Sequence, residues 1–366
     1  MDHLYVHIPF CSRRCSYCDF SIAVRQRVPG RAYVEAVRGE LGLIGDRMTA
    51  LRTLYFGGGT PSHLPPDALE GLVRTLVRAP SSELEVTLEA NPEDVTLKTA
   101  QAWRRMGITR ISLGAQSFDD RALHWMHRAH SAAETRAAVR ALGDAGFANV
   151  SLDLIFGLPS ELNRDWRRDL ECALTLEPTH LSLYGLTVEA RTSLARWVSR
   201  GATSAPDDER YADDYLVAHQ VLEGAGFEFY EVSNAARGAH RSRHNSAYWS
   251  GRAYTGLGPA AHSFDGTVRR WNIPAWEAYR RAVALGTRPL AGEEQLTPAL
   301  QELERRYLAL RTNEGLEVTA VSADQRARWQ RAGWITLTGD RVRCTPEGWL
   351  RLDALVTDLT GPTERA

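Results

Sequence analysis

Three cysteines lie close together near the beginning of the chain, at Cys11, Cys15 and Cys18. Three thiolates at this C-x3-C-x2-C spacing can bind three irons of a four-iron, four-sulfur cluster, which leaves the fourth iron without a protein ligand. An open iron can bind a small molecule, so such a cluster can take part in chemistry as well as carry an electron. The spacing therefore predicts a [4Fe-4S] cluster with one open coordination position.

Two other interpretations of the cysteines stay open from spacing alone. The same positions are compatible with one helix face, on which the three would be buried thiols. A structural zinc site usually takes four Cys or His ligands with paired short spacings, and nothing nearby completes such a set. A disulfide framework is not expected in a chain of 366 residues with five cysteines.

The composition is typical of a soluble globular protein, with 43% hydrophobic and 24% charged residues. The length suffices for one large domain and a small one. No apolar run is long enough for a membrane span, and the first residues lack the pattern of a secretory signal, so we expect a cytoplasmic protein. The net charge of −1 gives no global electrostatic argument for a nucleic acid partner.

The elements that would position the cysteines alternate along the first two-thirds of the chain. Short apolar stretches typical of strands lie at residues 4–8, 53–56, 84–88, 108–113, 150–155 and 180–184. Helical patterns lie between them, at residues 67–78, 97–106, 132–145 and 165–176. This alternation predicts an α/β fold with a parallel sheet and helices outside it. Six such units favour a partial (β/α)6 barrel over a closed barrel of eight.

Polar and glycine-rich groups follow the predicted strands. They are the cysteine loop after the first strand, the glycines before Thr60 after the second, Glu89 and Asn91 after the third, Gln116 after the fourth, and Asp153 near the end of the fifth. Because ligands of such folds bind at the carboxyl ends of the strands, we expect these groups to line one mouth.

The pattern changes after about residue 225. Residues 227–232 are typical of one more strand, and an irregular stretch follows to about residue 289. Residues 296–359 then predict two helices, a hairpin at 334–337 and 341–344, and a last helix, an order like that of a small winged-helix domain. We expect domains at 1–235, 236–290 and 291–366. The balanced charge of the last one favours packing or partner docking over DNA binding.

Six segments, taken together and in order, resemble a known family. They are YVHIPFCSRRCSYCDF, YFGGGTPS, LEANPE, RISLGAQSF, DLIFGLP and HNSAYW. The chain is similar over nearly its whole length to the radical S-adenosylmethionine (SAM) proteins. Within them it resembles the HemW heme chaperones, which are related to the oxygen-independent coproporphyrinogen III dehydrogenase HemN.

The resemblance implies that SAM binds the open iron through its amino and carboxylate groups, and that one electron from the cluster then breaks a carbon–sulfur bond to give an adenosyl radical. It assigns SAM contacts to Tyr5, Tyr17, Gly58, Gly59, Thr60, Glu89, Gln116, Arg128 and Asp153. These roles are chemically plausible, since an arginine pairs with a carboxylate and carboxylates accept from amino or ribose groups. Alternatively, the glycines make only a tight turn, and Asp153 is a buried residue satisfied by backbone donors.

The segment 244–249 matches the HNxxYW signature of the HemW proteins. A neutral imidazole is a natural axial ligand of heme iron, which makes His244 the candidate heme ligand. Tyr248 and Trp249 offer flat apolar surface for a macrocycle. The alternative is a loop anchored by two aromatic residues. Nearby cations for the propionates are Arg237, Arg241 and Arg243, and His262 is also expected to approach the site.

Two departures separate the chain from the dehydrogenases that it resembles. Phe20 occupies the position of their fourth cysteine, and their long N-terminal extension is not expected here. The resemblance therefore implies a heme chaperone, more than an enzyme, that binds heme and transfers it to acceptor proteins such as respiratory proteins. The alternative is a radical SAM oxidoreductase acting on coproporphyrinogen III or another tetrapyrrole. The same resemblance is compatible with peripheral membrane contact and with a homodimer.

Overall fold

The computed structural model describes residues 2–45, 51–79 and 81–360. Within them, one nine-stranded sheet has the strand order β11-β1-β4-β5-β6-β7-β8-β10-β9. Six neighbouring strands are parallel: β1 (His3–Ile8), β4 (Thr53–Gly58), β5 (Glu85–Ala90), β6 (Arg110–Gln116), β7 (Val150–Phe156) and β8 (His180–Gly185). They overlap the six predicted stretches, so the expected α/β fold with a partial barrel is confirmed.

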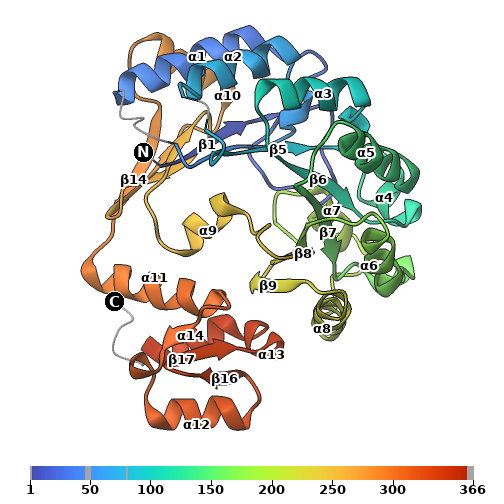
Figure 1. The fold of residues 1–366 in the computed structure, drawn as a ribbon, viewed down its shortest axis with the longest axis vertical. Helices are drawn as coiled ribbons and strands as arrows, with labels where there is room; N and C mark the ends of the chain where they lie inside the picture. Colours follow the sequence, from blue (N-terminus) through green and yellow to red (C-terminus); the bar gives the residue numbers. More distant parts are fainter. Residues whose placement is uncertain (1, 46–50, 80, 361–366) are drawn as a thin grey trace.

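Helices cover the outer face of this curved sheet (Figure 1). They are α1 (Gly30–Ile44), α2 (Pro66–Leu76), α3 (Leu97–Met106), α4 (Asp120–Trp125), α5 (Ala132–Asp144), α6 (Trp166–Leu174) and α8 (Asp208–Gly224). Helix α7 (Ser193–Ser199) instead packs against the cysteine loop, where the Leu194 amide donates to the Ser16 carbonyl. The connections also contain the single turns η1 (Pro61–His63), η2 (Pro92–Asp94) and η3 (Ser160–Leu162). The strands are buried on both faces and therefore appear in the sequence as continuous apolar runs.

The helices follow from local sequence signals. Helix α2 buries Leu69, Leu72 and Leu76, whose spacing places them on one face of the helix. Helix α3 begins at a capping box in which Thr96 accepts from the amide of residue 99. Helix α5 begins at the same kind of capping box, with Ser131 as the N-cap residue. Period and caps together explain why these helices were predictable.

The two edges of the sheet contain more strands than the prediction of six parallel strands and one further strand at residues 227–232. Strand β11 (Thr255–Leu257) adds to β1 in parallel. At the other edge β10 (Asn234–Ala236) is antiparallel to β8, and β9 (Glu228–Glu231), the predicted strand at 227–232, pairs with β10. The stretch predicted as irregular also forms α9 (Arg243–Trp249), α10 (Trp276–Ala284) and an antiparallel sheet of β12 (His262–Phe264), β13 (Val268–Asn272) and β14 (Leu290–Gln295).

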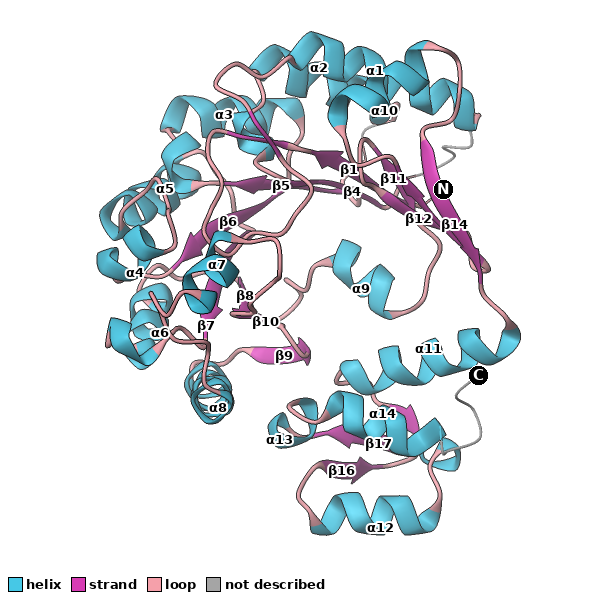
Figure 2. Ribbon diagram, turned by 180° about the vertical axis from the view of Figure 1, so that it is seen from behind, coloured by secondary structure: helices cyan, strands magenta, loops and turns pink. Residues whose placement is uncertain are grey.

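Helix α9 lies on the open side of the barrel. Figures 1 and 2 both show it between the central sheet and helix α11 (Pro298–Arg311), and it contacts β4 and α11. Residues from the barrel and from the C-terminal part of the chain therefore meet around α9.

The C-terminal elements follow the predicted order of two helices, a hairpin and a helical end, with a short strand added after the first helix and two helices in place of the last one. After α11 come β15 (Leu316–Glu317), the turn η4 (Val318–Ala320), α12 (Ala323–Arg331), the hairpin β16 (Ile335–Thr338) and β17 (Arg341–Cys344), α13 (Pro346–Trp349) and α14 (Leu352–Thr360). The strands form a separate sheet, β15-β17-β16. A second hydrophobic cluster around Leu310, Trp329 and Val342 holds these elements together. Whether the predicted boundaries delimit independent domains stays a prediction.

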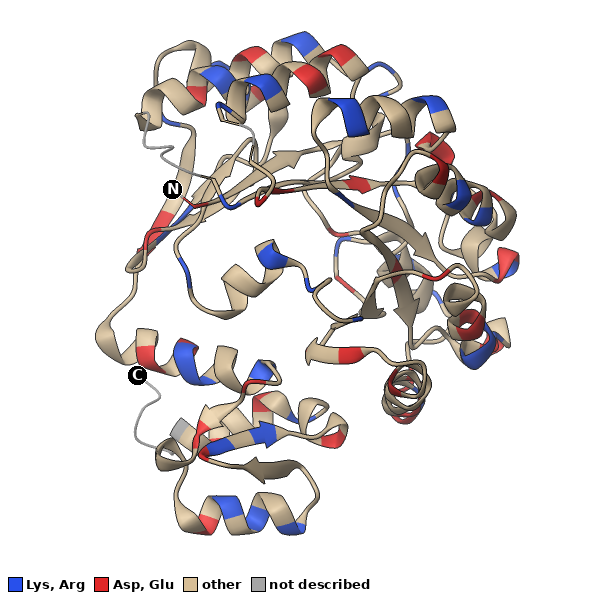
Figure 3. Ribbon diagram, in the orientation of Figure 1, with Lys and Arg blue, Asp and Glu red and all other residues tan. Residues whose placement is uncertain are grey.

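Acidic and basic residues alternate along helices α1, α2 and α11 (Figure 3). None of the helices that the structure describes combines the length and apolar character needed to span a bilayer.

Candidate functional site

The polar groups at the carboxyl ends of the strands line one cavity of about 400 Å³, which we call the cysteine cavity. Its walls come from the loop after β1 and from the ends of β4 to β8. The predicted site residues that line it are Cys11, Cys15, Tyr17, Cys18, Gly58, Gly59, Thr60, Glu89, Gln116, Arg128 and Asp153. The structure thus brings together every predicted site residue except Tyr5 and His244.

The cysteine loop is a short strand followed by turns. Cys11 ends β2 (Phe10–Cys11), which pairs with β3 (Ala23–Val24), and the Cys18 amide donates to the Cys15 carbonyl at 3.4 Å. The alternative of three thiols on one helix is therefore wrong. All three cysteines are free thiols.

Two polar side chains already donate to the sulfurs. The Thr60 hydroxyl donates to Cys11 Sγ at 3.3 Å, and Arg128 Nη1 donates to Cys15 Sγ at 3.4 Å. Burial raises the pKa of Cys11 to about 11, so this thiol keeps its proton until a metal displaces it.

Within the described residues no three His, Cys, Asp or Glu side chains converge on one metal ion, which disfavours the zinc alternative. In a four-iron cluster each thiolate binds a different iron, so the sulfurs lie farther apart than they do around a single metal ion. Three separate sulfurs facing one cavity therefore fit a cluster better than a single ion.

Two glycines allow β4 to approach the cysteine loop. A Cβ atom on Gly59 would lie 2.9 Å from both Cys11 Sγ and the Phe10 carbonyl oxygen. Gly58 has a φ of 116°, and a Cβ atom there would lie 2.8 Å from the ring of His7. The glycine run therefore sets close approach and backbone conformation, which goes beyond a tight turn.

Two half-buried carboxyl groups face the cavity from β5 and β7, the strands on either side of β6. Glu89 accepts from the Tyr55 hydroxyl at 2.9 Å and from the Gly58 amide at 3.0 Å. Asp153 accepts from the Ser112 hydroxyl at 2.9 Å, so its donors are serine hydroxyls rather than the backbone groups of the alternative. Burial raises the pKa of Asp153, and it raises the pKa of Glu89 to about 7.

A buried arginine beneath these carboxyl groups was not singled out from the sequence. Arg110 is 1% exposed, and its Nε and Nη2 atoms have no hydrogen-bond partner among the described residues. Its charge lowers the pKa of both Glu89 and Asp153, against the larger opposing effect of burial. A cation inside an apolar predicted strand was the signal that could have found it.

Gln116 and Arg128 complete the far wall of the cavity. Arg128 Nη2 donates to Asn91 Oδ1 at 2.6 Å and to the Gly114 carbonyl at 3.1 Å. Gln116 has a φ of 63°, a left-handed conformation that is uncommon for residues other than glycine. Such strain is typical of binding sites, where the surrounding structure holds it in place.

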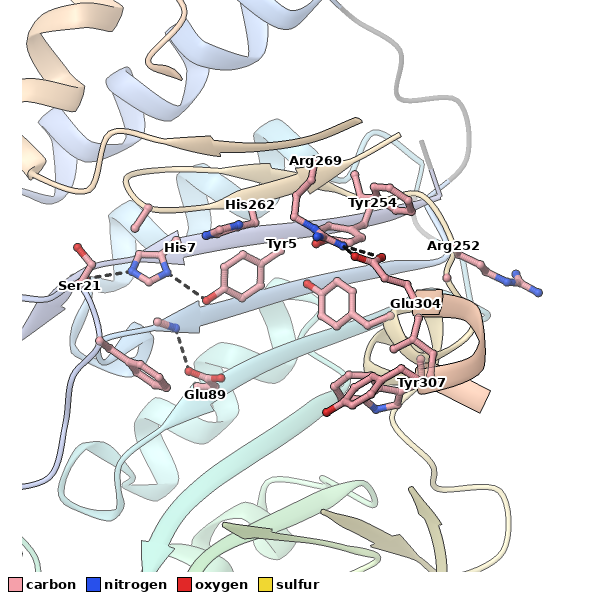
Figure 4. A pocket seen from close by; sticks show the side chains of 18 residues that line it. Tyr5, His7, Ser21, Glu89, Arg252, Tyr254, His262, Arg269, Glu304 and Tyr307 are labelled. Atoms are coloured by element: carbon pink, nitrogen blue, oxygen red, sulfur yellow. Dashed lines mark hydrogen bonds and ion pairs between the residues drawn. The ribbon is translucent and has the colours of Figure 1, made fainter. Parts of the chain in front are cut away.

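A second cavity of about 820 Å³, which we call the wide cavity, adjoins the first and shares Phe20, Gly58 and Glu89 with it. Tyr5 lines this cavity and not the cysteine cavity, which corrects its predicted place (Figure 4). Its hydroxyl lies 3.2 Å from His7 Nδ1, since the two side chains point to the same face of β1. His262, expected to approach the site, lines the wide cavity as well.

His244 lines neither cavity. It is 1% exposed, and both ring nitrogens are occupied: Nδ1 lies 2.7 Å from Thr53 Oγ1 and Nε2 lies 2.8 Å from the Tyr248 hydroxyl. Burial lowers the pKa of His244 to about 3, so the ring is neutral. Direct binding of iron would require one of these contacts to break.

The three arginines predicted to meet propionates are engaged elsewhere, and none lines the wide cavity. Arg237 donates to the Ala225 carbonyl, Arg241 pairs with Glu228, and Arg243 donates to the Glu83 carbonyl. Tyr248 and Trp249 do line it, as expected of a surface for a macrocycle.

Comparisons with known proteins agree with this architecture. A family model of the radical SAM superfamily matches residues 5–173. The heme chaperone HemW of Mycobacterium tuberculosis (strain CDC 1551 / Oshkosh) is 38% identical, over 98% of this chain and 94% of that protein. HemW of Bacillus subtilis (strain 168) is 33% identical, over 86% and 85%.

A solved structure, coproporphyrinogen III oxidase (HemN) from Escherichia coli, described as a radical SAM enzyme, is similar with a TM-score of 0.81. It is 20% identical and covers 98% of this chain and 90% of that one. At this identity the similarity concerns the fold, and it confirms the expected radical-SAM type of barrel.

Proposed function

Because this chain belongs to the HemW family of the radical SAM superfamily, we propose that it is a heme chaperone, which binds heme and passes it to acceptor proteins. The observation that carries the proposal is the similarity to proteins named heme chaperone HemW over 98% of the chain. The wide cavity beside the cysteine cavity supports it, since it offers room for a tetrapyrrole.

The cysteine cavity would hold the resident cofactors. Cys11, Cys15 and Cys18 would bind three irons of a [4Fe-4S] cluster, and the open iron would bind SAM. The bound cluster supplies the electron for cleavage of SAM or acts as a redox or structural centre. The residues proposed to surround SAM are Tyr17, Gly58, Gly59, Thr60, Glu89, Gln116, Arg128 and Asp153.

Individual roles follow from the contacts. Arg128 already donates to Cys15 Sγ and is half-buried, so its guanidinium would face the SAM carboxylate beside the cluster. Glu89 and Asp153 would accept from the amino group or the ribose hydroxyls. Burial raises the pKa of Glu89 to about 7, and a bound cation would lower this pKa and so favour the ionised carboxylate.

The cofactor part is tested by anaerobic reconstitution with ferrous iron and sulfide. The chain should become brown and bind SAM, and Cys15→Ala should lose this absorbance while Cys172→Ala keeps it. Cys172 is the matched control because it is a free thiol outside the cysteine cavity. Colourless parent protein would contradict the cluster.

The chaperone part is tested with hemin and the apo form of a b-type heme protein. The reconstituted chain should bind hemin saturably and then lose its Soret band as the acceptor gains one. Absence of saturable binding would contradict the proposal. Respiratory acceptors, a cytoplasmic location, peripheral membrane contact and a homodimer stay predictions.

The second candidate function is a radical SAM oxidoreductase acting on coproporphyrinogen III or another tetrapyrrole. The shared fold with the Escherichia coli oxidase favours keeping it. Formation of protoporphyrinogen IX from coproporphyrinogen III, in the presence of SAM and a reductant, would replace the chaperone proposal by this one.

A further inference from the structure

Resting on the proposed heme function, we propose that the wide cavity holds the heme, that His262 binds its iron, and that His244 acts only by holding Tyr248 in the cavity wall. Three observations lead to this assignment: the lining of the cavity, the hydrogen bonds of its histidines, and an arginine at its rim whose guanidinium has no partner among the described residues.

The wide cavity suits a flat, largely apolar macrocycle. At about 820 Å³ it has roughly twice the volume of the cysteine cavity. Seven of the residues that line it are aromatic and come from four separate regions of the chain: Tyr5, Phe20, Tyr248, Trp249, Tyr254, Phe264 and Tyr307. Flat rings of this kind pack against a porphyrin face and exclude water from it.

Three histidines lie in or next to this cavity, and they differ in whether a ring nitrogen is free. His7 is buried, with Nδ1 at 3.2 Å from the Tyr5 hydroxyl and Nε2 at 3.2 Å from the Ser21 carbonyl oxygen. His244 is also bonded at both nitrogens. His262 is exposed, and no hydrogen bond within the described residues occupies its ring. Iron needs a free nitrogen lone pair, which only His262 offers without breaking a contact.

The fold fixes the ring of His262. The residue opens β12 and pairs with Trp271 of β13, and the two rings stack with centroids 6.0 Å apart and planes at 25°. Figure 4 shows the His262 ring close to His7 and Tyr5, at one end of the cavity. This stacking favours one ring orientation, which reduces the side-chain entropy lost on binding iron.

The opposite end of the cavity carries a cation for the propionates. Arg269 is already paired, at 2.9 Å from Glu304. Arg252 is exposed and lines the cavity, and no hydrogen bond or ion pair of its guanidinium to another described residue is present. Figure 4 shows Arg252 at the far end from His262. A heme bound between them would place its anionic edge toward Arg252.

His244 acts through a neighbour. Its Nε2 atom holds the Tyr248 hydroxyl, and the Tyr248 ring packs edge-on against Tyr254 with centroids 4.5 Å apart. Both tyrosines line the wide cavity. Loss of His244 would therefore loosen one wall, which makes it a positioning residue.

The test compares hemin with iron-free protoporphyrin IX on the full chain. His262→Ala should weaken hemin binding by about tenfold or more and shift the Soret band, because an iron ligand is lost. Its affinity for protoporphyrin IX should be unchanged, since that ligand has no iron to bind. Added imidazole should restore the hemin spectrum of this variant. His124→Ala, which removes an exposed histidine of α4, is the control.

His244→Gln should keep the parental Soret band, because His262 remains as the iron ligand and glutamine can still bond the Tyr248 hydroxyl. Glutamine cannot replace an imidazole on iron, so the band would be lost if His244 were the ligand. Arg252→Ala should weaken binding of both porphyrins by about twofold to fivefold without moving the band, as expected of an exposed ion pair. A parental spectrum and affinity in His262→Ala, or a lost Soret band in His244→Gln with protoporphyrin IX binding intact, would overturn the assignment. Failure of the parent chain to bind hemin would instead refute the proposed function.

Discussion

The carboxyl group of Glu40 should make the stability of the fold depend on pH. Glu40 is buried in α1 and accepts from the Gly258 amide at 2.8 Å, from Asn272 Nδ2 at 2.5 Å and from the Tyr279 hydroxyl at 2.6 Å. It thereby ties α1 to the loop that leads to His262. Burial nevertheless raises the pKa of Glu40 to about 7, against the opposing effect of these donors.

The sign follows from the numbers of bound protons. Between about pH 4.5 and 7 the folded state keeps the Glu40 proton, whereas the unfolded chain releases it. Stability therefore falls as the pH rises through this window. A shift of about 2.5 pKa units corresponds to about 3 kcal/mol between the two ends of the window.

Glu40→Gln cannot ionise, so it should lose this dependence. Urea unfolding, followed by tryptophan fluorescence at pH values across the window, would give the free energy of unfolding of the parent chain and the variant. The difference between them should change by about 3 kcal/mol in favour of the parent as the pH is lowered. Glu35→Gln, on the exposed face of the same helix, is the control. Equal pH dependence in the parent and Glu40→Gln would refute the reasoning.

Two further substitutions test the packing that supports the sites. Gly59→Ala should abolish cluster reconstitution without unfolding the chain, because its Cβ atom would lie 2.9 Å from Cys11 Sγ and from backbone atoms. Analysis of bound iron and sulfide measures this loss. The control Gly42→Ala, whose Cβ atom has no neighbour within 4 Å, should bind the cluster normally. Leu310→Ala should cost about 2–5 kcal/mol in chemical unfolding, because the side chain is fully buried in the C-terminal cluster. Leu300→Ala, on the same helix and 40% exposed, should cost less than about 0.5 kcal/mol, and equal costs would contradict the assigned core.

The parallel strands and outer helices were predictable because each carries its own signal, a continuous apolar run or a 3.6-residue period. Strand β11 carries none, since it has three residues and forms only because β1, some 250 positions earlier, offers an edge. The clustering of Glu89, Arg128 and Asp153 followed from the rule that the carboxyl ends of parallel strands meet at one edge.

Local sequence patterns do not reveal what surrounds a side chain, even where they predict the course of the chain. A motif brings His244 near a porphyrin site, but its type does not reveal that Thr53 occupies one nitrogen from 191 positions away. Likewise the family resemblance placed Tyr5 with the SAM residues, whereas the alternation of β1 turns its side chain toward the wide cavity. Contacts of this kind depend on tertiary packing and cannot be obtained from local spacing.

The partition formed by Phe20, Gly58 and Glu89 belongs to both chambers. A ligand that moves these shared residues from one cavity changes the binding affinity of the other cavity, and thermodynamic linkage makes this effect reciprocal. If SAM raises the affinity for heme by some factor, heme must raise the affinity for SAM by the same factor. Unloading the tetrapyrrole would then be governed by the state of a nucleoside it never touches.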